Sequence, residues 1–294
     1  MIETNKIIVF PHLRGRIPDN PVNISNVAIQ DVAAEQPDNY IYDCYENINS
    51  EINNIISNIH GESQLIELYV QDEMASDKNH LSKSIDSIKN NCLRLTKFSS
   101  NMIDLKRINN NKFCLYVNNV NIIEVIEDIV LNVSNNIKDK KIIFDTNTEE
   151  KFMPCDVAKI QKAILILLSN IIKYSNVKEV FVKLHAIDTN IDISISFKNK
   201  DKMLLNFFKS KMDNLNDYSI EDNSVGFYIC KSIISLHEGQ LELTDNGKEA
   251  NFLIQLPCDN TNSILYLYRN DKILNSASLT EQIQIEFSDL YEYK

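Results

Sequence analysis

Apolar residues between positions 38 and 108 recur every three or four residues, which is the period of helices that pack on other helices. The first series contains Tyr45, Ile48, Ile52, Ile55, Ile59, Leu65, Ile66 and Tyr69, and the second runs from Leu81 through Leu105. A short turn at 74–77 separates them, so the pattern predicts an antiparallel hairpin of two long helices. One hairpin cannot bury both apolar stripes. We therefore expect a second copy to complete a four-helix bundle, which makes the protein a homodimer.

After a polar linker at 109–112 the pattern becomes a mixture of helices and strands. Amphipathic helices are predicted at 122–137, 156–174 and 225–237, with Asp156 as an N-cap and Gly239 as the C′ glycine of the last helix. Alternating apolar and polar positions predict strands at 113–117, 141–146, 179–186, 191–197, 240–244 and 250–256. The last four strands form two hairpins. The fold class is therefore α+β, with helices on one face of a mostly antiparallel sheet.

These patterns divide the chain into four parts. Residues 1–38 hold four of the six prolines and form an extended N-terminal arm. Residues 39–109 form the helical hairpin, 110–260 the α/β sandwich and 261–294 a C-terminal extension. The arm either packs on the neighbouring helices or serves as a docking segment.

Composition narrows the class of protein. A net charge of −11 argues against nucleic acid as a partner, because phosphate contacts need clustered Lys and Arg. The six cysteines and five histidines show no spacing typical of metal ligands, so reduced thiols are expected. No apolar run reaches the roughly 18–20 residues that span a bilayer, and residues 1–6 are too polar for a signal peptide. We therefore expect a cytoplasmic protein without a membrane span.

Three patches in the chain carry a resemblance to a known family. Residues 167–175 read L-L-S-N-I-I-K-Y-S, which is similar to the N box of sensor histidine kinases, and residues 225–239 resemble their second glycine box and its helix. Residues 283–291, I-Q-I-E-F-S-D-L-Y, look like a tail found in some of these kinases. The resemblance covers residues 40–257. It implies a dimerisation and phosphoacceptor hairpin followed by an ATP-binding α/β sandwich of the histidine-kinase ATPase type.

The resemblance also implies which residues face a nucleotide. In the family the N-box Asn coordinates Mg²⁺ and the N-box Lys contacts the nucleotide. These roles fall on Asn170 and Lys173, with Tyr174 next to them. Of the second box's glycines, Gly226 clearly remains.

The adenine-reading motif departs from the family pattern. The family uses an Asp in a D-x-G-x-G motif after the strand that corresponds to 191–197, and here Asn199 stands at that place. No glycine lies between Gly61 and Gly226. The chain therefore lacks the residues that let a loop wrap closely around phosphates.

The phosphoacceptor position departs from the family pattern as well. Alignment of N-I-N-S-E-I at 47–52 with the family's N-I-S-H-E-L places Ser50 at the histidine that takes the γ-phosphoryl group, with the acidic Glu51 beside it. A serine hydroxyl is a poor replacement, because its pKa lies far above that of imidazole. Asn54 follows Ser50 at i+4, where some family members use Thr or Asn to orient a water towards the phosphoaspartate of a response regulator.

We therefore predict a histidine-kinase-like protein of a two-component system or phosphorelay that lacks autokinase activity, in other words a pseudokinase. It would act by binding a response regulator or a partner histidine kinase. No cofactor is expected; ATP and Mg²⁺ would bind only if the degenerate site retains affinity, with Asn170 as the metal ligand. One alternative is a response-regulator phosphatase that uses Glu51 and Asn54. Another is a kinase that is still active with an unorthodox acceptor.

Overall fold

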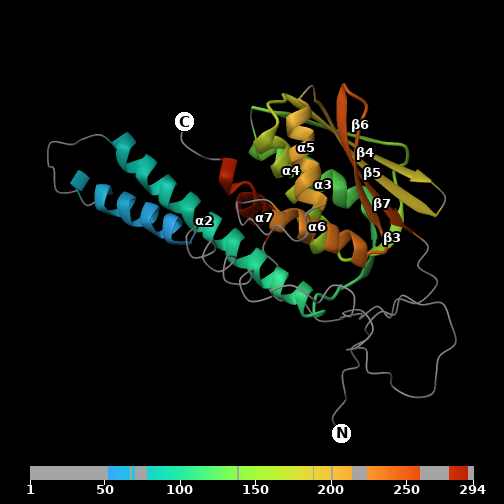
Figure 1. Ribbon diagram of the computed structural model, residues 1–294, viewed down its shortest axis with the longest axis horizontal. Coiled ribbons are helices and arrows are strands. Elements are labelled where there is room, and N and C mark those ends of the chain that lie inside the picture. Colours follow the sequence, from blue (N-terminus) through green and yellow to red (C-terminus); the bar gives the residue numbers. More distant parts are fainter. Residues whose placement is uncertain are drawn as a thin grey trace, which may run out of the picture.

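A computed structural model describes residues 52–66, 68–69, 78–137, 139–187, 189–199, 201–213, 224–258 and 278–290. They form a long helical part that lies alongside an α/β part (Figure 1). None of the helices in these ranges is both long and apolar enough to cross a lipid bilayer.

The helical part contains residues 52–66 and α2 (Lys78–Asn109), which run in opposite directions in Figure 1. Near the tip of the hairpin, the ring of Tyr69 stacks on that of His80 with centroids 5.8 Å apart. Ile55, on the predicted apolar stripe, is 2% exposed. The helical hairpin is thus confirmed over these residues, and its pairing with a second copy stays a prediction.

The α/β part is built on a five-stranded sheet with the order β2-β4-β5-β7-β6. Its strands are β2 (Lys141–Thr146), β4 (Glu179–Ile187), β5 (Asn190–Lys198), β6 (Gln240–Asp245) and β7 (Glu249–Pro257). β2 pairs with β4 in parallel, and each of the other neighbouring pairs is antiparallel. A two-stranded sheet joins β1 (Asn118–Asn121) to β3 (Phe152–Cys155). The predicted α+β class is confirmed.

Helices pack on this sheet to form one core. The helices on the sheet are α3 (Ile122–Asn136), α4 (Val157–Tyr174), α5 (Lys202–Asp213) and α6 (Ser224–Leu236). A further helix, α7 (Leu279–Glu286), packs on α2, α3 and α4, and a 3₁₀ turn, η2 (Ser288–Leu290), follows it. Alternate residues of β4, β5 and β7 are buried with the apolar faces of these helices, as the period of a half-buried strand requires. Figure 1 shows α7 between α2 and the α/β part.

The strand predicted at 113–117 is wrong. Phe113 and Val117 are buried and alternate with exposed residues, as predicted, but the segment pairs with no strand among the described residues. Instead the backbone N–H of Tyr116 donates to the side chain of Asp156 at 2.8 Å. An alternating pattern reports which side of a segment is buried, whereas strand pairing also needs a neighbouring backbone.

The end of α6 also differs in detail from the prediction. Glu238, with φ 59°, takes the left-handed conformation, and the N–H of Gly239 donates to Ile234 at 2.9 Å. Gly239 is needed for a different reason: a Cβ there would lie 2.5 Å from the carbonyl oxygen of Gln255. The glycine therefore permits a close approach between α6 and β7.

Candidate functional site

Helix α4 carries three of the residues predicted to face a nucleotide, all near its C-terminal end. Asp156 begins the helix as predicted, and its side chain accepts a hydrogen bond from the N–H of Lys159 at 3.2 Å. Residues 163–172 are buried without a break, so this stretch of the helix is packed on every side. Asn170, Lys173 and Tyr174 follow at i, i+3 and i+4 and therefore lie on neighbouring positions of one side.

Asn170 is buried with one polar atom unsatisfied. The side chain is 4% exposed, and its Nδ2 donates to the carbonyl of Ile166 at 2.7 Å. Its Oδ1 has no hydrogen-bond partner among the residues that the structure describes. An unsatisfied buried acceptor costs roughly 1–3 kcal/mol, so this atom retains unused capacity for a donor or a cation.

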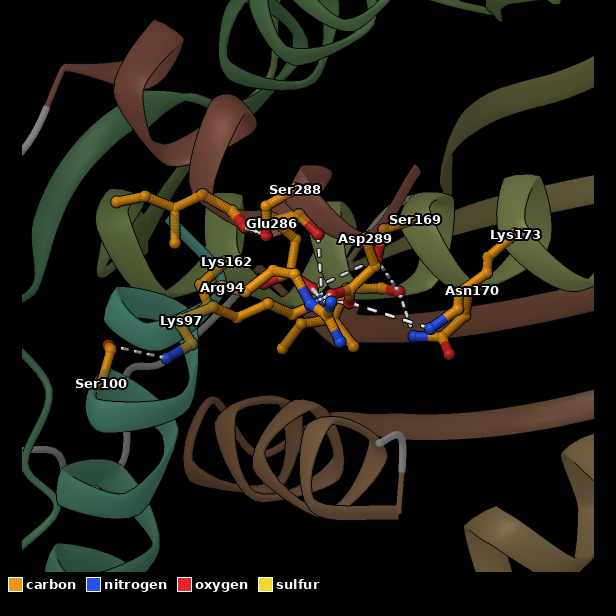
Figure 2. Close-up of polar contacts among 12 residues, drawn as sticks. Arg94, Lys97, Ser100, Lys162, Ser169, Asn170, Lys173, Glu286, Ser288 and Asp289 are labelled. Atoms are coloured by element: carbon orange, nitrogen blue, oxygen red, sulfur yellow. Dashed lines mark hydrogen bonds and ion pairs between the residues drawn. The ribbon is translucent and has the colours of Figure 1, made fainter. Parts of the chain in front are cut away.

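Two carboxylates, Glu286 at the end of α7 and Asp289 in η2, lie beside this face of α4. Glu286 accepts a hydrogen bond from the hydroxyl of Ser169 at 3.1 Å, and Asp289 lies 3.9 Å from the ammonium of Lys173. Figure 2 shows both carboxylates between the side chains of α2 and those of α4. The site therefore combines residues from three elements that are distant in sequence.

Helix α2 contributes the cations that neutralise these carboxylates. The ammonium of Lys97 lies 2.8 Å from Asp289 and 3.2 Å from Glu286, and it also donates to the backbone carbonyl of Glu286 at 3.0 Å. The Nε of Arg94 lies 3.3 Å from Asp289. Lys97 and Asp289 are 192 residues apart in the chain.

Burial makes this network energetically important. Burial disfavours the charged form of Lys97, but the carboxylates of Glu286 and Asp289 outweigh it and raise the pKa of Lys97. Burial by itself would raise the pKa of Asp289, but the positive charges of Lys97, Lys173 and Arg94 outweigh it and lower that pKa. Both groups are therefore charged at neutral pH, and each charged form depends on the other.

The pocket between α2, α4 and η2 is filled by these side chains. It is lined by Lys97, Ser169, Asn170, Lys173, Glu286, Asp289 and Leu290, and it has no room for a water molecule.

A further ion pair joins α2 and α4 directly: the ammonium of Lys162 on α4 lies 2.7 Å from the carboxylate of Asp104 on α2. Figure 2 shows Lys162 with its other partner, the hydroxyl of Ser100.

Asn199, at the predicted adenine-reading position, uses its side chain within its own turn. The Nδ2 donates to the carbonyl of Asp201 at 3.0 Å, and the Oδ1 accepts from the N–H of Asp201 at 3.0 Å. The carboxylate of Asp201 then accepts from the N–H of Met203 at the start of α5. Asn199 is 7% exposed, and the hydrogen bonds of its side-chain amide connect β5 to α5.

Aromatic rings fill the space between α5 and the sheet. Phe208 is fully buried, with ring centroids 5.4 Å from Phe252, 5.9 Å from Phe227, 6.2 Å from Phe197 and 6.4 Å from Tyr174. Tyr174 therefore packs against α5 by its ring, in addition to lying beside Lys173 on α4.

Gly226 lies where α6 packs on α4. A Cβ at this position would lie 3.4 Å from a methyl group of Ile166, at the short end of ordinary van der Waals contact. Ile166 precedes Asn170 by one helical turn. The structure thus brings Gly226 close to the helix of Asn170, Lys173 and Tyr174, whereas the side-chain bonds of Asn199 stay within its own turn.

The predicted phosphoacceptor region is described in part. Ser50 and Glu51 lie outside the described residues. Asn54 lies on the helix of residues 52–66 and is exposed, as is His60 further along.

Sequence reasoning missed the charged residues that occupy the α4 face. The similarity of 283–291 to a family tail drew attention to the segment, but nothing local pairs Glu286 or Asp289 with Lys97. Helix α5 was missed as well, although Asp201 as a cap followed by Leu205, Phe208 and Met212 at helical spacing would have predicted it.

Comparison with known proteins agrees with this geometry. Residues 155–260 match the family described as histidine kinase-, DNA gyrase B-, and HSP90-like ATPase. The heme sensor protein HssS of Staphylococcus aureus is 25% identical over 222 residues, which cover 72% of this chain. The chain spans about half the length of the curated relatives it matches, 46% in the case of HssS.

Two solved structures share the fold. The histidine kinase AdeS of Acinetobacter baumannii has a TM-score of 0.54 at 15% identity, with 71% of this chain and 98% of that chain covered. The histidine kinase ThkA, in complex with the response regulator TrrA, has a TM-score of 0.52 at 16% identity, with 75% and 63% covered. The chain therefore has the fold of the histidine kinases, is homologous to sensor histidine kinases, and carries over residues 155–260 an ATPase domain of the histidine kinase, DNA gyrase B and HSP90-like family.

Proposed function

We propose that this protein acts in two-component signalling as a histidine-kinase-like binding partner without autokinase activity. One observation carries the proposal: the carboxylates of Glu286 and Asp289 lie against the face of α4 where the N box would meet Mg²⁺ and phosphate. The phosphates of ATP are anionic, so carboxylates at this face repel them. The carboxylate of Asp289 also pairs with the ammonium of Lys173, which would otherwise attract a phosphate.

The residues present do not fit a magnesium–nucleotide complex at the other end of the site either. The family's adenine-reading carboxylate is replaced by Asn199, whose amide is engaged by Asp201. Phe208 fills the space between α5 and the sheet with its ring. We therefore infer that ATP does not bind here.

The partner proposed is a response regulator or a second histidine kinase. The relative ThkA is described in complex with a response regulator, which supports the first choice for a chain of this fold. Exposed apolar residues on the hairpin support a protein partner or a second copy of this chain: they are Ile56, Leu65, Leu68, Ile85 and Ile103. A homodimer through these helices is part of the proposal.

The direct test mixes the purified protein with Mg²⁺ and γ-labelled ATP, alongside an active histidine kinase as a positive control. We expect no label on the wild-type protein and no thermal stabilisation by MgATP. Label that disappears in Ser50→Ala, or in His60→Ala, which removes the exposed histidine further along the same hairpin helix, would refute the proposal.

A second variant separates the two defects. Ser50→His restores an imidazole at the acceptor position without changing the α4 face. We expect this variant to stay unlabelled, because the nucleotide site is closed independently of the acceptor. If Ser50→His becomes labelled, the site binds ATP and only the acceptor has been lost.

The exposure of Asn54 favours one alternative function, a response-regulator phosphatase that uses Asn54 with Glu51. This function predicts faster decay of a phosphorylated regulator in the presence of the protein, and loss of that effect in Asn54→Ala. Asn53→Ala is the matched control, because Asn53 is its exposed neighbour on the same helix. Equal loss in both variants would indicate a binding surface rather than an oriented water.

A further inference from the structure

Residues 278–290 lie in contact with both the helical hairpin and the α/β part. α7 and η2 pack against α2 on one side and against α4 on the other. Ile283 and Phe287 supply the apolar contact and are fully buried. The segment therefore lies between the helical hairpin and the ATPase domain, where a change in its position affects both.

The polar contacts of this segment cross from one part to the other. Glu286 is held by Ser169 of α4 and by Lys97 of α2, and Asp289 is held by Lys97 and Arg94 of α2 and lies near Lys173 of α4. Each carboxylate thus joins the hairpin to the ATPase domain. The side chains of Asp289 and Glu286 are 9% and 8% exposed, so solvent does not replace these partners.

The cations would form an anion site if the segment were absent. Arg94, Lys97 and Lys173 lie 3.3, 2.8 and 3.9 Å from Asp289, and Asn170, whose Oδ1 is unsatisfied among the described residues, lines the same pocket. Cations that lie this close together repel one another, and carboxylates placed among them offset that repulsion. The carboxylates of the segment supply the counterions, which makes the segment an internal ligand of this site.

We propose that residues 278–290 are an intramolecular strap, which occupies the Lys97–Lys173 site as an acidic ligand and fastens the helical hairpin to the ATPase domain. The strap keeps polyanions out while it is docked. Its release exposes the three cations and frees α2 from α4 on this side. A polyanion and the strap therefore compete for the same site.

The test measures amide hydrogen exchange in Asp289→Asn and in a matched control, Glu281→Gln. Asp289→Asn keeps the shape of the side chain and removes the charge that Arg94, Lys97 and Lys173 share. Glu281 lies on α7, within the same segment, and is exposed, so neutralising it leaves the interface unchanged. We expect exchange in 279–290 and in 90–100 of α2 to rise about tenfold or more in Asp289→Asn, because hydrogen bonds to charged groups contribute at least that factor.

The sheet is the internal standard for the same measurement. Exchange in β4 and β5 should not change if the segment is a strap on an otherwise intact domain. Faster exchange in the sheet together with α7 would show that the segment is an integral part of the core, and this would overturn the proposal. Unchanged exchange in α7 would overturn it as well.

Inorganic tripolyphosphate is the second probe. We expect it to bind Asp289→Asn at least tenfold more tightly than the wild type or Glu281→Gln, and to slow exchange around Arg94 and Lys97 in that variant. Equal binding to all three proteins would show that the strap does not occupy the anion site.

Discussion

Replacement of Lys97 by Met removes the cation that both carboxylates share and keeps an unbranched side chain of similar length. The consequences for the carboxylates differ. Asp289 retains Arg94 at 3.3 Å and Lys173 at 3.9 Å. Glu286 loses its ion pair with Lys97 and keeps the hydrogen bond from the hydroxyl of Ser169 at 3.1 Å. The variant therefore leaves Glu286 as a poorly compensated buried charge.

The magnitude follows from burial. The side chain of Lys97 is 13% exposed and that of Glu286 is 8% exposed, so the pair is almost fully desolvated. Removal of one partner of a buried pair costs roughly 3–5 kcal/mol, and we expect about 3 kcal/mol here because Asp289 stays paired. For a domain of this size that corresponds to a fall in Tm of about 6–12 °C.

Two double variants give the reasoning its sharpest test. Lys97→Met/Glu286→Gln removes the uncompensated charge, so it should be more stable than Lys97→Met alone, with a coupling energy of about 1–3 kcal/mol. Lys97→Met/Asp289→Asn removes a carboxylate that still has two cations, so it should be less stable than Lys97→Met alone. Urea unfolding at pH 7 measures the stability of the single and double variants. The pKa of Asp289 is lowered from its ordinary value of 3.8, so the stabilising contribution of this carboxylate is complete at pH 7.

The second substitutions should change the stability of Lys97→Met in opposite directions, and this difference tests whether Lys97 acts through Glu286. If both second substitutions destabilise Lys97→Met, or if every effect is additive, Lys97 does not act through Glu286 in the way that the geometry indicates.

Three further predictions concern the core and the backbone. Burial lowers the pKa of His237, whose neutral Nε2 accepts a hydrogen bond from the N–H of Asp156. Its stabilising contribution is therefore complete above pH 6.5 and declines as the pH falls below that value. His237→Gln should make the free energy of unfolding vary less between pH 7 and pH 5. Phe208→Ala should lower the unfolding free energy by about 3–5 kcal/mol, because the fully buried ring leaves a cavity. Gly239→Ala should lower the free energy of unfolding by about 1–3 kcal/mol, because the new Cβ clashes with the carbonyl of Gln255. Gly61→Ala should raise the free energy of unfolding by about 1 kcal/mol, because Gly61 lies in a helix with open space around its Cα. Thermal denaturation of both variants checks the two signs.

Much of the fold was predictable because it depends on local periodicity. The start of α4 at Asp156 and the hairpins of β4 with β5 and of β6 with β7 were predicted from apolar spacing and turn residues. The strand at 113–117 failed because its hydrogen-bond partner is a side chain, that of Asp156, and no pattern within the segment reports this.

The candidate site was predictable only in part. Resemblance located Asn170, Lys173 and Gly226, and the structure places all three on α4 or against it. It did not reveal that Asn199 is engaged within its own turn, because such a bond depends on the backbone path into α5.

The sequence by itself determined the helical hairpin and the α+β class, because each is a property of residues close together in the chain. Only the tertiary structure decided that Glu286 and Asp289 face α4 and share Lys97. The physical reason is that helices and strands repeat with a fixed period, whereas an ion pair between residues 192 positions apart has no period. Its partners are determined by how α2, α4 and α7 pack together.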